Sequence, residues 1–460
     1  MKYTVITFGC RVNQADSLGF EEELRRRGAT AASSDEADVV IVNTCSVTSS
    51  ADQGARQTVR RLARINPEAK VVVTGCYATR RPDEFDRLAN VLRVVPNGDK
   101  TRVVALLAAD LGLTTSERFG DGDGGCGAAI EPGVAGRTAF TLRVQTGCAQ
   151  PCAYCIIPAT RGAPRSAPPG GLLAEVDRIA RAGFKEIALT GVHLGSYGRD
   201  LQPASSLLEL LRAFRDWRES NVPPMARPPA PNGVAADGGD VLRDRPTPDV
   251  RFRISSLEPM DCSPEIIDLV ARGDGFAPHF HLPLQHASDR MLAAMRRPYT
   301  SARYAALVGA IRARIPSASI GSDVIVGFPG ETAADFDVLC ACLEQSPLTH
   351  VHVFPYSDRP GTIASAMSGK VHGTVIRERA ARVREIGGRL TAGFRQAQLG
   401  SIHRALTLED GSLAVTGNYV KVRIPAGRVR NEWIRVRITG VGDPMRAEVL
   451  DEPGACFVRT

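Results

Sequence analysis

The first hundred residues repeat one pattern three times: a short β-branched run, a cysteine close behind it and a helical stretch. The runs are Tyr3 to Phe8, Asp38 to Thr44 and Lys70 to Thr74, and the cysteines that follow them are Cys10, Cys45 and Cys76. This alternation is typical of parallel βα units in an open sheet. Because the carboxyl ends of parallel strands share one edge, we expect the three thiols to converge there. Any one of them alone could equally be a buried structural cysteine.

A second group of three cysteines, Cys148, Cys152 and Cys155, lies within eight residues, directly after the strand-like run Phe140 to Val144. Three thiolates on one loop can hold three corners of an iron or zinc centre. The fourth corner then comes from elsewhere or stays open. An open corner is a place where chemistry can occur.

Strand and helix patterns continue to alternate after this loop. The strand candidates are Phe140 to Val144, Glu186 to Leu189, Val250 to Ser255, His279 to Leu284, Ser319 to Val326 and His350 to Phe354. Six such repeats predict a partial (β/α)6 barrel, in which the loops after the strands carry the working groups. The histidines near these runs, His193, His279, His281 and His286, are more often packing groups than metal ligands, so we assign them no role.

Composition divides the chain into parts. We expect an amino-terminal domain over residues 1–113, a linker over 114–136, a barrel over 137–373, a connecting helix over 374–398 and a small β-barrel over 399–460. Seven of the seventeen residues from Gly120 to Gly136 are glycine, which is linker composition, and Cys126 within it is interpreted as incidental. Residues 221–249 hold seven prolines and are predicted to be a disordered insertion. The other cysteines, Cys262, Cys340, Cys342 and Cys456, are interpreted as structural.

The tail is basic. Between Ser412 and Thr439 there is one acid, Glu432, and there are six basic residues, namely Lys421, Arg423, Arg428, Arg430, Arg435 and Arg437. Tyr419 and Trp433 lie among them. Basic side chains interleaved with aromatic ones on a small barrel suit RNA, through phosphate contacts and base stacking. A solvated charged surface is the alternative.

Charge and cysteine usage place the chain in a broad class. The formal net charge is +7 and arginine far outnumbers lysine, which suits phosphate-rich partners. Eleven cysteines without a disulfide-type spacing fit a reducing compartment. No signal peptide is recognisable at the start, and no apolar run approaches the roughly eighteen residues of a membrane span. We therefore expect a soluble cytoplasmic protein without membrane association.

With both cysteine groups placed, the chain resembles the radical-SAM methylthiotransferase family over nearly all of its length, except the glycine-rich and proline-rich segments. The spacing Cys148-x3-Cys152-x2-Cys155 is the one by which radical-SAM enzymes hold a 4Fe–4S cluster. The earlier cysteines match the family's amino-terminal trio, and the tail is similar to its TRAM module. Further agreement comes from Arg161-Gly162 with Arg165-Ser166, from Arg253 to Pro259 and from Asp323 to Glu331.

Two stretches bear on the branch within the family. Thr7 to Gln14 and His352 to Ser357 look most like enzymes acting on N6-threonylcarbamoyladenosine at position 37 of tRNA. Gln285-His286-Ala287-Ser288 departs from the expected Gln-Ser-Gly-Ser. This departure puts the contacts of that loop in doubt, but it does not affect the prediction of either cluster.

The resemblance implies two 4Fe–4S clusters and S-adenosylmethionine as cofactors. The cluster on Cys148, Cys152 and Cys155 would bind S-adenosylmethionine and generate a radical. The cluster on Cys10, Cys45 and Cys76 would deliver a methylthio group to adenosine C2. The partners implied are the tRNA anticodon stem-loop and an electron donor such as a flavodoxin or ferredoxin, and we expect a monomer. No catalytic residue beyond the cluster ligands is assigned.

Other functions remain open from the sequence alone. The same chemistry could act on N6-isopentenyladenosine at position 37 of tRNA or on a ribosomal-protein aspartate, although the basic tail favours RNA. From a different class, the chain could be a zinc-bearing RNA-binding protein without catalysis.

Overall fold

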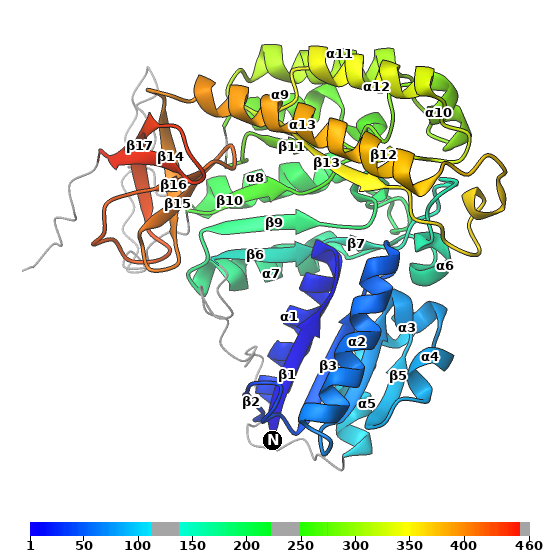
Figure 1. Ribbon diagram of the computed structural model, residues 1–460. Helices are drawn as coiled ribbons and strands as arrows, with labels where there is room; N and C mark the ends of the chain where they lie inside the picture. Colours follow the sequence, from blue (N-terminus) through cyan, green and yellow to red (C-terminus); the bar gives the residue numbers. More distant parts are fainter. Residues whose placement is uncertain (112–137, 222–248, 274, 451–460) are drawn as a thin grey trace, which may run out of the picture.

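The computed structural model describes residues 1–111, 138–221, 249–273 and 275–450. Figure 1 shows an amino-terminal α/β part below a middle βα part, with a small β-barrel at the side of the latter. The predicted fold class, an open parallel sheet, a partial radical-SAM barrel and a carboxy-terminal β-barrel, is confirmed. The segment 114–136 with Cys126, all but the end residues of the segment 221–249, and Cys456 lie outside the described residues.

The amino-terminal part is a parallel sheet flanked by helices. Its elements are β1 (Lys2–Thr7), α1 (Arg11–Arg26), β2 (Thr30–Ala31), β3 (Val39–Thr44), α2 (Ser49–Ile65), β4 (Lys70–Gly75), α3 (Cys76–Arg80), α4 (Asp83–Asp86), β5 (Val91–Val95), a 3-10 turn (Asn97–Arg102) and α5 (Val103–Asp110). The strand order is β2-β1-β3-β4-β5, so the three strands that precede cysteines are neighbours. Strand β3 is buried along its whole length, as expected for a central strand covered on both faces.

The middle part holds six parallel strands. Its elements are β6 (Ala139–Arg143), β7 (Gln145–Thr146), α6 (Ile157–Arg161), β8 (Arg165–Ser166), α7 (Pro169–Arg181), β9 (Glu186–Thr190), α8 (Leu207–Asn221), β10 (Arg251–Ile254), α9 (Pro264–Ala271), β11 (His279–His281), α10 (Asp289–Ala294), α11 (Ser301–Arg314), β12 (Ser319–Val326), α12 (Ala333–Gln345), β13 (His350–Pro355) and α13 (Gly373–Ala397), with 3-10 turns at Leu194–Ser196, Pro259–Asp261 and Ala364–Ala366. The six parallel strands form two three-stranded sheets, β10-β9-β6 and β11-β12-β13. Strands β7 and β8 form a separate two-stranded sheet.

All six predicted strands of the middle part are present, and only β11 is markedly shorter than expected. Pro283 has no backbone N–H to donate, and the Leu284 N–H bonds the Ser322 hydroxyl instead of a backbone carbonyl. Helix α13, predicted as a connector, also packs against β13 and contributes Val383 and Ile386 to the core of this part.

The tail is a closed five-stranded barrel in the order β14-β15-β16-β18-β17. Its strands are β14 (Ile402–Leu408), β15 (Leu413–Thr416), β16 (Lys421–Arg423), β17 (Trp433–Gly440) and β18 (Met445–Val449). Buried and exposed residues alternate along β17, which gives the barrel an apolar inside and a charged outside.

A buried ion cluster attaches this barrel to the middle part. Glu186 accepts from Arg251 and Arg253, and all three side chains are at most 9% exposed. Arg253 also donates to the Gly417 carbonyl of the barrel at 3.1 Å. The Trp433 ring lies against Arg251, and its indole N–H donates to the Asp249 carbonyl at 3.0 Å. Trp433 therefore serves the contact between the two parts and is not presented for base stacking.

Candidate functional site

The first cysteine group forms where β1, β3 and β4 end. Cys45 and Cys76 are buried, Cys10 is exposed, and all three are free thiols. Gly9 has a φ of 91°, and a Cβ at this position would overlap the Cys45 side chain, so glycine permits the close approach of the two loops. Burial, together with the neighbouring Cys10 and Cys76, raises the pKa of Cys45 to about 12. Such a thiol ionises when a metal cation replaces its proton.

One arginine of the middle part reaches into this group. Arg161, at the end of α6, is 4% exposed, and the nearby Cys76 and Asp16 raise its pKa despite its burial. Its guanidinium donates to the Asn13 side chain and to Asp16. Arg161 therefore places a fixed positive charge beside the sulfurs of the amino-terminal part.

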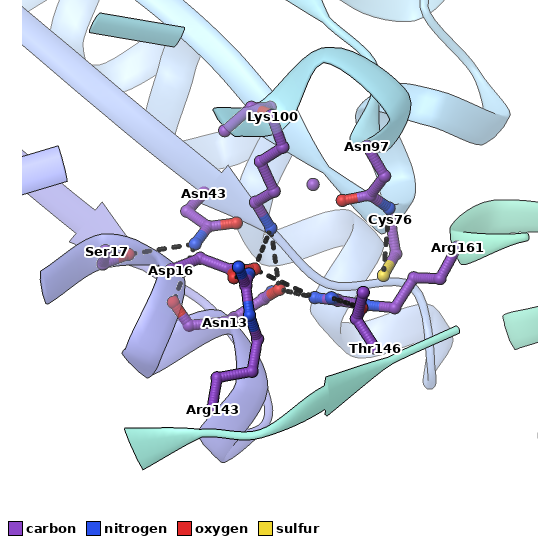
Figure 2. Close-up of polar contacts among 12 residues, drawn as sticks. Asn13, Asp16, Ser17, Asn43, Cys76, Asn97, Lys100, Arg143, Thr146 and Arg161 are labelled. Carbon is purple, nitrogen blue, oxygen red and sulfur yellow. Dashed lines mark hydrogen bonds and ion pairs between the residues drawn. The ribbon is translucent and has the colours of Figure 1, made fainter. Parts of the chain in front are cut away.

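Figure 2 shows that Asp16 is the centre of this network. Its carboxylate pairs with Lys100 at 2.7 Å, with Arg161 at 3.3 Å and with Arg143. Burial alone would raise the pKa of the Asp16 carboxyl, but the three cations outweigh burial and hold that pKa below its ordinary value. Asn97 donates to the Cys76 sulfur at 3.6 Å and to the Thr160 carbonyl at 2.9 Å. The network thus joins the amino-terminal and middle parts beside the first cysteine group.

The second cysteine group lies on the loop between β7 and α6. The Arg297 guanidinium donates to the Cys152 sulfur at 3.1 Å and pairs with Glu258. The Gln150 backbone N–H donates to the Cys148 sulfur at 3.4 Å. Burial, together with the neighbouring thiols of Cys152 and Cys148, raises the pKa of Cys155 to about 12. Each cysteine group therefore consists of three clustered thiols with one buried arginine against a sulfur, a donor set that fits an iron–sulfur cluster with one iron left free.

Two adjoining cavities are each lined by a cysteine of a different group. One, of about 200 Å³, is lined by Cys155 and the following Ile156, and the other, of about 500 Å³, is lined by Cys10. The residues common to both walls are Val47, Ile157, Asp323 and Phe354. The two cavities thus share part of their walls, and each is lined by a cysteine from a different group.

Histidines occupy two different environments. His279 and His281 line the larger cavity together with His350 and His352. Burial, together with the neighbouring imidazoles of His281 and His352, lowers the pKa of His350 to about 4. His286, in contrast, is fully buried, bonds Glu331 at 3.2 Å and accepts from the Ser288 N–H. The unusual Gln285 to Ser288 loop therefore presents His286 to the core and not to the cavities.

His193 lies beside the second cysteine group, next to Cys148. Its Nε2 is 2.8 Å from Asp261. Burial opposes protonation, but bonds to Asp261 and Cys148 prevail and raise the pKa of His193 to about 9.

Most of the six basic tail residues are exposed. Arg428 is only partly so, and it pairs with Glu432 at 2.9 Å. Lys421 pairs with Glu409 at 3.2 Å and Arg437 with Glu448 at 2.7 Å. Arg423 is exposed and has no ion pair within the part of the chain that the structure describes. Tyr419 faces the larger cavity, with Arg253 4.6 Å from its ring centre.

Sequence reasoning located the six cysteines but not the polar groups around them. Arg161 and Asn13 occur in stretches already singled out for their resemblance to the family. The sequence therefore pointed to these two residues but did not show what they do. Asp16, Lys100 and Arg297 carried no signal, because only the folded chain brings them to the sulfurs.

Two family models match the chain. The first, described as uncharacterized protein family UPF0004, matches residues 2–96, and the radical SAM superfamily matches residues 142–343. In the described residues, no helix is both long and apolar enough to cross a membrane.

Named relatives cover almost the whole chain. The threonylcarbamoyladenosine tRNA methylthiotransferase MtaB of Aquifex aeolicus is 33% identical over 95% of this chain and 100% of its own length. The ribosomal protein uS12 methylthiotransferase RimO of Salinispora tropica is 33% identical over 88% of this chain and 83% of its own. Among solved structures, the radical S-adenosylmethionine methyltransferase TsrM of Kitasatospora setae has a TM-score of 0.53 at 15% identity, covering 79% of this chain and 73% of that one. This last similarity concerns the fold alone.

Proposed function

This chain belongs to the radical-SAM methylthiotransferase family, and we propose that it transfers a methylthio group to C2 of N6-threonylcarbamoyladenosine at position 37 of tRNA. Four relatives named for threonylcarbamoyladenosine tRNA are 29–33% identical to it over at least 95% of its length. S-adenosylmethionine and an iron–sulfur cluster are cofactors of the radical SAM superfamily to which the middle part belongs.

The observation that carries the proposal is the pair of adjoining cavities, one lined by Cys155 and the other by Cys10. A reaction that first activates a carbon and then delivers sulfur to it needs two such centres around one substrate. The larger cavity, of about 500 Å³, has the size of a small-molecule site and suits a nucleoside turned out of its stack.

The residues divide into two sets in this proposal. Cys148, Cys152 and Cys155 would hold the cluster that, with S-adenosylmethionine, supplies the radical. Arg297 lies against the Cys152 sulfur and offsets the negative charge of that site.

Cys10, Cys45 and Cys76 would hold a second cluster of the same type. Cys10 is the exposed member and lines the larger cavity, so this side of the site faces the substrate. Arg161 offsets negative charge here, as Arg297 does at the other group. Buried positive charge of this kind stabilises the more reduced, more negative state of a cluster.

The remaining partners belong to the same proposal. A small electron donor such as a flavodoxin or ferredoxin would reduce the clusters, and the protein would act as a cytoplasmic monomer.

The identity of the modified nucleoside is tested by mass analysis of tRNA from cells with and without this gene. We expect 2-methylthio-N6-threonylcarbamoyladenosine to disappear in the deletion strain and to return when the intact gene is restored. Unmethylthiolated N6-threonylcarbamoyladenosine should accumulate in its place. Loss of a 2-methylthio-N6-isopentenyladenosine signal instead, or of the modified ribosomal-protein aspartate, would assign the chain to one of the alternative substrates.

The basic face of the barrel is proposed to bind the anticodon stem-loop, and Arg423 is the residue to test. It is exposed and forms no direct ion pair within the described residues, and it interacts electrostatically with the exposed Asp410, for which a phosphate can substitute. We expect Arg423→Ala to weaken stem-loop binding and to reduce the slope of log affinity against log salt concentration by about 1.

Fluorescence anisotropy over a salt series provides this measurement. The matched control is Arg314→Ala on α11, because this arginine is also exposed but pairs with Asp268 on the middle part. If both variants keep the wild-type slope, the barrel face around Arg423 is not the binding surface.

A further inference from the structure

Three histidines cluster on one face of the β11-β12-β13 sheet. The parallel register aligns His281 with Gly321 and His350, and two residues further along β12 and β13 it aligns Asp323 with His352. One ring nitrogen from each of His281, His350 and His352 lies within 4.8 Å of the others. The ring centres are 5.5, 5.6 and 6.2 Å apart. Three imidazoles on one zinc ion have ring centres roughly 5 Å apart, because each Zn–N bond is about 2.0–2.1 Å long.

Two of these imidazoles are oriented by an oxygen at their other nitrogen. His281 Nε2 is 3.0 Å from Asp323 Oδ1, which leaves Nδ1 for a further partner. His350 Nδ1 is 3.0 Å from Thr349 Oγ1, and the Thr349 hydroxyl donates to the Ile320 carbonyl at 3.1 Å. Since the Thr349 hydroxyl has a backbone carbonyl to donate to, it can accept from His350 Nδ1, which leaves Nε2 of His350 for a further partner. Such outer partners are typical of metal-ligating histidines.

Gly321 makes room for the cluster. It lies between His281 and His350 in the register, and a Cβ on it would overlap Nε2 of His350. The imidazole nitrogen therefore lies directly over bare backbone in the middle strand.

We propose that His281, His350 and His352 form a binding site for a divalent transition-metal ion of the zinc type, with Asp323 orienting His281. Imidazole ligands suit Zn²⁺ and neighbouring first-row ions. Three protein ligands leave a coordination position open, and the three histidines line the larger cavity together with Cys10. An oxygen of the bound substrate can fill that position. This site is separate from both cysteine groups.

Zinc binding to the cluster-loaded protein tests the proposal. After anaerobic dialysis against buffered Zn²⁺, we expect the wild-type protein to hold about one zinc per chain. The His350→Ala and His352→Ala variants should lack this zinc. Zinc absorption spectroscopy should show nitrogen neighbours at about 2.0–2.1 Å with the scattering pattern of imidazole. Asp323→Asn should keep the site but weaken zinc binding by about 10- to 100-fold.

His372→Ala is the control, because this histidine lies at the start of α13, away from the cluster, and should leave the zinc content unchanged. Iron content and thermal melting of each variant establish that clusters and fold are retained. If His350→Ala is too unstable to study, Gly321→Ala offers a second variant that displaces the ring without removing it. Equal zinc in wild type and in the histidine variants, no zinc in the wild type, or a shell made of sulfur would overturn the proposal.

Discussion

Replacing Cys45 by alanine is expected to abolish methylthiolation of tRNA while S-adenosylmethionine is still cleaved reductively. Replacing Cys152 by alanine is expected to abolish both reactions. Cys45 is a buried member of the group at the ends of β1, β3 and β4, whereas Cys152 belongs to the loop before α6. We expect the lost activities to fall by more than about 100-fold, since loss of an outer partner alone costs up to that much.

Both products are measured in one anaerobic reaction, as 5′-deoxyadenosine and as the methylthiolated nucleoside. Cys340→Ala serves as the control, because this thiol lies on α12 at the edge of the apolar core. Near-normal methylthiolation by the Cys45→Ala protein would rule out the second cluster. Equal loss of cleavage in both folded variants would rule out the separation of roles.

Asp16→Asn is expected to destabilise the protein by about 3–5 kcal/mol, because removing one member of a buried ion cluster leaves its partners uncompensated. Asp16 is the shared acid of Lys100, Arg143 and Arg161, and its side chain is 1% exposed. Denaturant unfolding followed by circular dichroism, with iron content in parallel, measures the effect. The first cysteine group should lose its cluster before the second does.

Asp110→Asn is the matched control for this prediction. Asp110 also pairs with an arginine, Arg93, but near the surface of the same part, so its removal should leave the unfolding transition close to that of the wild type.

The contribution of Asp16 to stability depends on pH with a defined sign. Because the folded-state pKa of Asp16 is depressed, its contribution is present above its unfolded pKa of about 3.9 and is lost as the pH falls towards the folded value. Equal destabilisation by both substitutions would remove the special role of Asp16.

The sequence predicted the elements that follow from local pattern. β-branched runs predicted β1, β3 and β4, and their common direction predicted that Cys10, Cys45 and Cys76 would meet. The short strands β2 and β5 were missed, because β2 has only two residues and only one residue of β5 is fully buried. Short β-prone runs in the tail predicted a small β-barrel, but not that Trp433 would pack against Arg251.

The site was predictable only as far as its cysteines. Their ligand role depends on residue type and spacing, which are properties of the chain itself. The roles of Asp16 and Arg297 depend on neighbours 145 residues away in sequence, and no local pattern reports such a distance. The histidine cluster illustrates the same limit, since His281 was consistent with ordinary packing until the register of three strands aligned it with His350 and brought His352 near.

Arg161 has a consequence for how such enzymes can be recombined. The residue is six positions beyond Cys155 in the middle part, yet its guanidinium completes the surroundings of Cys76 in the amino-terminal part. A chimera that joins the first hundred residues of one relative to the middle part of another must therefore inherit a matched set of Asn13, Asp16, Lys100, Arg143 and Arg161. The amino-terminal part is therefore not an independent module, although the predicted linker over 114–136 separates it from the middle part in the sequence.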